Sequence, residues 1–157
     1  FSNEKLEDAL LWFSLSLEFL DLLDKIDIAK VCRWKARCYL ALFDLDRAKE
    51  CLDLADDHDP DSLCTQYVRF LISLEKGNPE ELRQLLVNQK TKKNIDYSAY
   101  LEVMADAAYK HGKFETALEA LCILLKDSSL IQEPGKYGEI FQNWIRLTYS
   151  QFQKEMR

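Results

Sequence analysis

The sequence predicts an all-α fold of about eight helices in antiparallel pairs, and three observations support this. Four Gly and three Pro in 157 residues leave little turn chemistry, which favours long helices with short connections. Apolar residues recur three and four positions apart along most of the chain, as in amphipathic helices. Equivalent turns also recur at an almost constant interval, 34 residues from Phe43 to Gly77 and 35 from Gly77 to Gly112.

Bulk composition narrows the function classes. With 48% hydrophobic and 31% charged residues, the chain can bury a core without disulfides. A net charge of -6 argues against a dedicated nucleic-acid binder, whose phosphate contacts require a basic surface. Neither a leader of charged then apolar residues nor a run of about 18 apolar residues occurs, so we predict no signal peptide and no membrane span. The five Cys contain no C-x-x-C pair, which indicates reduced, mostly buried thiols of an intracellular protein.

The first segment reads as an unpaired helix. Asn3 to Leu23 carries apolar residues at helical spacing, at Leu6, Leu10, Phe13, Leu17 and Leu20. It has the pattern of the second helix of a pair whose first helix is missing. We therefore expect an internal fragment of a longer array.

The segment from Ala29 to Pro60 reads as two helices folded back on each other. Two antiparallel helices approach closely only where their side chains are small. Ala36 is therefore expected to contact the following helix near Ala48, with Tyr39 filling the wedge beside them. Pro60 ends this pair or starts the next helix.

Two further pairs and a last helix are expected. Leu63–Lys76 forms a helix, and Gly77-Asn78-Pro79 is a helix stop followed by a helix start. After a polar connection, Tyr97–Lys110 and Phe114–Leu125 form another pair. A loop is predicted from Asp127 to Gly138, followed by a helix that is apolar over much of its circumference.

The alanine and aromatic spacing resembles a tetratricopeptide repeat (TPR), a helix pair of 34 residues. With Pro60 at the thirty-second position, Ala36, Tyr39, Ala48 and Ala55 fall at positions eight, eleven, twenty and twenty-seven. Cys32 and Lys35 depart from the usual Trp and Leu. The resemblance implies a right-handed α-solenoid, divided into a partial repeat 1–28, repeats 29–62, 63–97 and 98–132, and a terminal helix 133–157.

No catalytic, cofactor or metal site is predicted. The chain lacks G-x-S-x-G, a phosphate-binding Gly-rich loop and H-E-x-x-H, and its two His lie at helix ends in polar surroundings. The run from Cys51 through His58 to Cys64 fits no structural zinc spacing. Asp57-x-Asp59-x-Asp61 lacks the Gly and Glu of a calcium loop, so we interpret it as a solvated turn. We therefore predict that the protein is not an enzyme.

The TPR resemblance implies a concave groove that binds partner peptides. Its residues would be basic in the first repeat, apolar in the second and acidic with an aromatic in the third. The candidate partner-binding residues are Lys30, Arg33, Arg37, Tyr67, Leu71 and Tyr109. Arg33 and Arg37 are expected to lie outside the core. The alternative is that the basic residues form an ordinary solvated helix face.

A narrower resemblance rests on four motifs. They are Ala29-Lys30 with Cys38-Tyr39-Leu40, His58-Asp59-Pro60, Thr65-Gln66-Tyr67 with Phe70, and Glu75-Lys76-Gly77-Asn78. Together with the Ala9–Leu17 segment, they resemble the meiosis-specific TPR scaffold family of the synapsis-initiation complex, called testis-expressed protein eleven in mammals. The likeness covers roughly the first half of the chain.

That resemblance implies a nuclear scaffold on meiotic chromosomes. It would promote crossover formation and synapsis by gathering recombination and synapsis proteins, without catalysis, membrane attachment or direct nucleic-acid contact. A TPR adaptor of another intracellular complex and a helical regulatory domain of an enzyme remain alternatives. Self-association is also expected through apolar surface exposed at both ends, carried by Leu6, Leu10, Phe13, Leu17, Trp144, Ile145 and Phe152.

Overall fold

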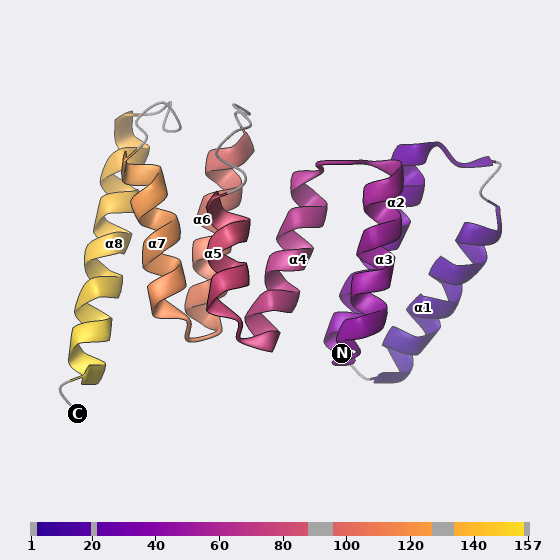
Figure 1. Cartoon of the computed structure of the whole chain (residues 1–157), viewed down its shortest axis with the longest axis horizontal. Helices are drawn as coiled ribbons and strands as arrows, with labels where there is room; N and C mark the ends of the chain where they lie inside the picture. The colour runs from indigo at the N-terminus through magenta and orange to yellow at the C-terminus, as the bar shows by residue number, and fades with distance from the viewer. Residues whose placement is uncertain (1–2, 20–21, 88–95, 127–133, 156–157) are drawn as a thin grey trace. The chain divides into compact units, whose positions relative to one another are not determined.

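The computed structural model describes residues 3–19, 22–87, 96–126 and 134–155, and this part of the chain is helical without β-strands. The prediction of an all-α protein with about eight helices is therefore confirmed. Figure 1 shows the helices, which are α1 (Asn3–Glu18), α2 (Lys25–Ala41), α3 (Leu45–His58), α4 (Leu63–Lys76), α5 (Pro79–Val87), α6 (Asp96–Lys110), α7 (Phe114–Lys126) and α8 (Pro134–Glu155). They form two compact units, Phe1–Ile72 and Ser73–Arg157, with α4 crossing the boundary.

Most helix ends follow local sequence signals. The Asp24 and Asp44 side chains accept hydrogen bonds from backbone N–H groups three residues ahead and cap α2 and α3. Asn78 caps α5 in the same way. α3 ends at His58, two residues before Pro60, and α4 has the bounds predicted from its apolar pattern.

Two predicted boundaries are wrong. α1 ends at Glu18, not at Leu23. The predicted loop from Asp127 to Gly138 is too long, because α8 begins at Pro134. Proline is tolerated in the first turn of a helix, where its missing N–H would have no partner. The rest of that predicted loop, 127–133, lies outside the described residues.

The turns that close α2, α4 and α6 share one backbone conformation. Phe43, Gly77 and Gly112 have φ of 59°, 69° and 71°, the left-handed region that ends many helices. In two of these turns, the N–H of the next residue bonds to the carbonyl five residues back: Asp44 to Tyr39 at 2.9 Å and Lys113 to Ala108 at 2.8 Å. The turns that recur in the sequence thus also share a left-handed backbone conformation.

Of these three residues, Phe43 has the strained backbone, because residues with a side chain disfavour positive φ. Phe43 is 76% exposed, so little packing would be lost on removal of its side chain. Phe43→Gly should relieve about 1–2 kcal/mol of strain. This exceeds the roughly 0.5–1 kcal/mol that glycine adds in unfolded-chain entropy. We expect the free energy of unfolding to rise by about 0.5–1 kcal/mol, measured by urea denaturation. Gly112→Ala is the opposite control: its added Cβ meets open space, so a loss of stability would report backbone strain alone.

The first unit is built around the α2–α3 pair. Ala36 and Ala48 are both fully buried in one cluster with Leu52, and Tyr39 packs against it half-buried. The predicted close contact at these alanines is confirmed. A second cluster joins α2 to Ala55 of α3. α1 packs against α2, and its Leu17 covers the second cluster.

The predicted exposed residues of α1 are on the wrong face of the helix. All four, from Leu6 to Leu17, are half-buried, because the side that carries them faces α2. The exposed large apolar residues of α1 and of the described part of the turn that follows are Leu11, Trp12, Leu15, Phe19 and Leu22. In α8, Ile145 and Phe152 are exposed as predicted, whereas Trp144 is half-buried and stacks on Phe141 with ring centroids 6.0 Å apart.

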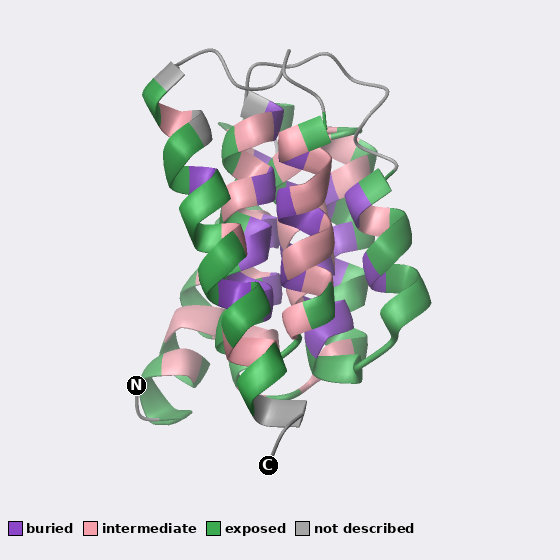
Figure 2. Ribbon diagram, turned by 90° about the vertical axis from the view of Figure 1, so that its left-hand side faces the viewer, coloured by how far each residue is buried: buried purple, intermediate pink, exposed green. Residues whose placement is uncertain are grey.

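The second unit is built around α7, which packs against α5, α6 and α8. Its buried residues, Ala117, Ala120, Leu121 and Leu124, lie on one side of the helix. Tyr97, buried at the start of α6, donates a hydrogen bond of 2.7 Å to the carbonyl of Leu86 in α5. Figure 2 shows the same division along other helices, with a buried side and an exposed side.

Candidate protein-interaction surfaces

Arg33 belongs to the core of the first unit. Its Nη1 donates to Asp59 Oδ2 at 2.9 Å and to the hydroxyls of Ser62 and Thr65, each at 3.4 Å. The residue is only 9% exposed. The expectation that Arg33 lies outside the core is therefore wrong. Its guanidinium joins α2 to the α3–α4 turn and to the first turn of α4.

Lys30 and Arg37 remain on the exposed face of α2. Lys30 donates to Asp27 at 2.8 Å, and this carboxylate raises the pKa of the Lys30 ammonium. Arg37 lies over the ring of Trp34, 5.0 Å from its centroid, and Trp34 is 53% exposed. The face is therefore a basic stripe with an aromatic in its middle.

Trp34 is a surface residue that the TPR alignment misses, because it falls at a position that does not line the groove of those repeats. Helical spacing alone could have placed Trp34 beside the two basic residues. Trp34 is four residues after Lys30 and three before Arg37, which places the three on one side of a helix.

Tyr67 and Leu71 of α4 are half-buried in the first unit, one helical turn apart. Tyr109, the remaining candidate, is 44% exposed and belongs to the second unit. The candidates therefore fall into two sets, one in each unit.

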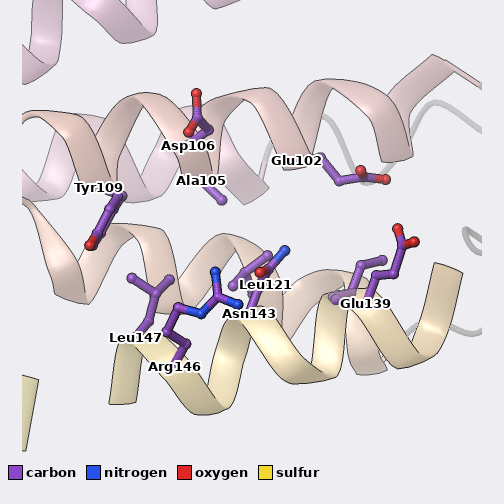
Figure 3. A pocket seen from close by; sticks show the side chains of 10 residues that line it. Glu102, Ala105, Asp106, Tyr109, Leu121, Glu139, Asn143, Arg146 and Leu147 are labelled. Carbon is purple, nitrogen blue, oxygen red and sulfur yellow. The ribbon is translucent and has the colours of Figure 1, made fainter. Parts of the chain in front are cut away.

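The second unit contains a groove of about 390 Å³ between α6, α7 and α8. Figure 3 shows its side chains. One wall belongs to α6 and contains Glu102, Asp106 and Tyr109. They lie in the third predicted repeat, where the TPR resemblance implied an acidic part of the groove with an aromatic residue. The floor and opposite wall, which sequence reasoning missed, are Leu121 of α7 with Glu139, Ile140, Asn143, Arg146 and Leu147 of α8. We refer to this set as the α6–α8 groove.

The helix contacts explain why α8 forms a wall of the α6–α8 groove. α7 packs against both α6 and α8, so the outer helices flank it. Among the residues of α8 whose burial is described, Ile140 and Leu147 are the buried ones, seven positions apart on one side. The polar residues beside them, Glu139, Asn143 and Arg146, then border the groove.

Two acidic side chains of α6 are paired within the chain. Lys110 donates to Asp106 at 2.6 Å, one turn away on the same helix. Lys136 of α8 has its Nζ 3.2 Å from Glu102 Oε1, close enough for an ion pair but outside hydrogen-bond geometry. Tyr109 packs edge-on against Phe114, with centroids 5.5 Å apart. The groove thus offers an apolar floor, paired charges and an aromatic side chain, features common to ligand-binding sites.

The five cysteines differ in burial. Cys32 and Cys51 are buried, Cys38 and Cys122 half-buried and Cys64 exposed, so the expectation of mostly buried thiols holds only in part. Burial raises the pKa of the Cys51 thiol to about 11 and also raises that of Cys32. These two thiols stay protonated near neutral pH, as suits core side chains.

Within the described ranges, no group of three or more His, Cys, Asp and Glu side chains is arranged to hold a metal ion. The helices in these ranges also lack the combined length and apolar character that a membrane crossing requires.

No protein-family model matches the chain, and no solved structure matches it with significance.

Proposed function

We propose that this chain is a protein-interaction scaffold whose α6–α8 groove holds segments of partner proteins. The observation that carries the proposal is the groove itself, where charged and aromatic side chains border an apolar floor between packed helices. Concave sites of this kind, between helices and with a few polar groups, are usual places for ligand and peptide recognition. The exposed Trp34 and Arg37 on α2 support a second contact surface in the first unit.

We propose further that the helix pairs are TPR-like repeats of a right-handed solenoid. Support comes from the left-handed turns at Phe43, Gly77 and Gly112, which all fall at position fifteen of the predicted repeats. The small residues at the close-approach positions of the first and third repeats are buried, as such packing requires. They are Ala36, Ala48, Ala55, Ala105 and Ala117.

The proposed setting is the meiotic nucleus. There the parent protein would gather recombination and synapsis proteins on chromosomes, without a reaction of its own. The support for this is the motif resemblance in the first half of the chain, from Ala29-Lys30 to Gly77-Asn78. The partners would be protein segments, which bind such grooves through a few anchoring side chains.

A pull-down from meiotic and from somatic tissue tests the proposal. The chain should recover chromosomal recombination and synapsis proteins, identified by mass spectrometry, from meiotic extract only. Tyr109→Ser should reduce that recovery about tenfold, because an exposed aromatic in a groove is a typical binding hot spot. Tyr149→Ser is the matched control, since Tyr149 is 62% exposed on α8 and does not line the groove.

Recovery of the same proteins from somatic extract would indicate an adaptor of another complex. Equal loss with both tyrosine variants, or with neither, would contradict the assignment of binding to the α6–α8 groove.

A further inference from the structure

Two charged side chains of the α6–α8 groove differ from the others in having no ion-pair partner among the described residues. Asp106 and Glu102 are each paired with a lysine of the chain. Glu139 and Arg146 of α8 form no ion pair within the residues that the structure describes. Both are exposed and both line the groove. An available carboxylate and an available guanidinium therefore border the same groove.

The positions of Glu139 and Arg146 make the two ends of the groove differ in charge. Glu139 and Arg146 are seven residues apart, which corresponds to about 10 Å along a helix axis. In Figure 3, Glu139 and Glu102 lie toward one end of the view, and Arg146 and Tyr109 lie toward the other end. The potential along the groove thus changes from negative to positive. The apolar side chains of Leu121, Ile140 and Leu147 line the same groove.

We propose that the α6–α8 groove selects an extended protein segment with opposite charges three residues apart. Its Lys or Arg lies at Glu139, its Asp or Glu lies at Arg146, and an apolar residue between them covers Leu121. Three residues of polyproline II conformation advance about 9 Å and return to the same side of the segment. This repeat is close to the separation of Glu139 and Arg146 along the axis of α8. The proposal rests on the proposed scaffold function and names the partner chemistry of the same groove.

An extended segment and a helical segment differ in the charge spacing that they would present to the groove. A helical partner would present charges seven residues apart, and that spacing can be tested directly.

The test is fluorescence polarisation with labelled nine-residue peptides in a Ser background. The probe carries Lys and Glu three residues apart around a central Leu-Pro. Two companion peptides replace this pair by two Lys or two Glu, and a third carries Lys and Glu seven residues apart around a central Leu-Ala, which a helix tolerates. The wild-type chain should bind the probe at least about fivefold more tightly than each companion, because a like-charge pair loses one attraction and adds repulsion, and the longer spacing cannot place both charges at once in an extended segment. The preference should weaken as salt is raised.

Charge reversals on α8 should change which peptide the chain prefers. Arg146→Glu should turn the preference to the two-lysine peptide, and Glu139→Lys to the two-glutamate peptide. Lys126→Glu is the control, an exposed charge of α7 outside the groove that should leave the preference unchanged. Circular dichroism should show unchanged helix content, since neither Glu139 nor Arg146 is buried.

Equal binding of all peptides, tighter binding of the seven-residue spacing, or an Arg146→Glu variant with the wild-type preference would each overturn the inference. In those cases a pull-down that still depends on Tyr109 leaves the scaffold function standing. Conversely, if the peptide preference reverses as expected but the pull-down ignores Tyr109, the segment chemistry holds and the scaffold proposal fails.

Discussion

Arg33→Ala should lower the free energy of unfolding by about 2–4 kcal/mol, because it removes one partner of a largely buried ion pair. The Arg33 side chain is 11% exposed and that of Asp59 is 30% exposed, with 2.9 Å between Nη1 and Oδ2. Without the guanidinium, the Asp59 carboxylate and the buried Thr65 hydroxyl lose a shared donor. Urea denaturation followed by circular dichroism at 222 nm, a standard helix signal, would measure the loss.

Arg37→Ala is the matched control, since Arg37 is exposed on the same helix and lies over the exposed ring of Trp34. It should change stability by about 0.5 kcal/mol or less. Equal effects of the two substitutions would contradict the buried role of Arg33. Binding experiments must therefore treat Arg33 and Arg37 separately. Reversing both charges at once cannot isolate a binding role, because the change at Arg33 is expected to disturb the fold.

Ala48→Leu should lower the free energy of unfolding by about 1–3 kcal/mol, because a larger side chain must enter a filled seam. Ala48 is fully buried with Ala36, Cys51 and Leu52 where α3 meets α2. Separating the helices to admit three more carbon atoms would also displace Tyr39, which covers this cluster. The same denaturation experiment measures the effect.

Ala41→Leu is the control for this substitution, since Ala41 is the exposed last residue of α2. Leucine there adds the same volume on the surface and should change stability by about 0.5 kcal/mol or less. A neutral Ala48→Leu, or an equal cost at both positions, would show that the α2–α3 seam has room and that its alanines are not required.

The positions of the helices could be predicted because their causes lie within a few residues. Apolar spacing gave the bounds of α4, and side chains such as Asp44 cap the helix that begins beside them. The turns at Phe43, Gly77 and Gly112 recur at an almost constant interval in the sequence, and all three have a positive φ in the structure. The close contact of Ala36 with Ala48 followed from size alone, because only small residues let two helices approach.

The tertiary structure decided which helix faces are covered and which charges are paired. α1 is apolar on more than one side, so its pattern could not show that the Leu17 side would pack on α2 and leave Trp12 exposed. Arg33 shares its helical spacing with Arg37, but its partner Asp59 lies 26 residues away. The α6–α8 groove joins Tyr109 to Arg146 across the intervening helix α7. Local sequence thus determined the helices, whereas burial and ion pairing depend on long-range packing, which brings distant residues together and excludes water from between them.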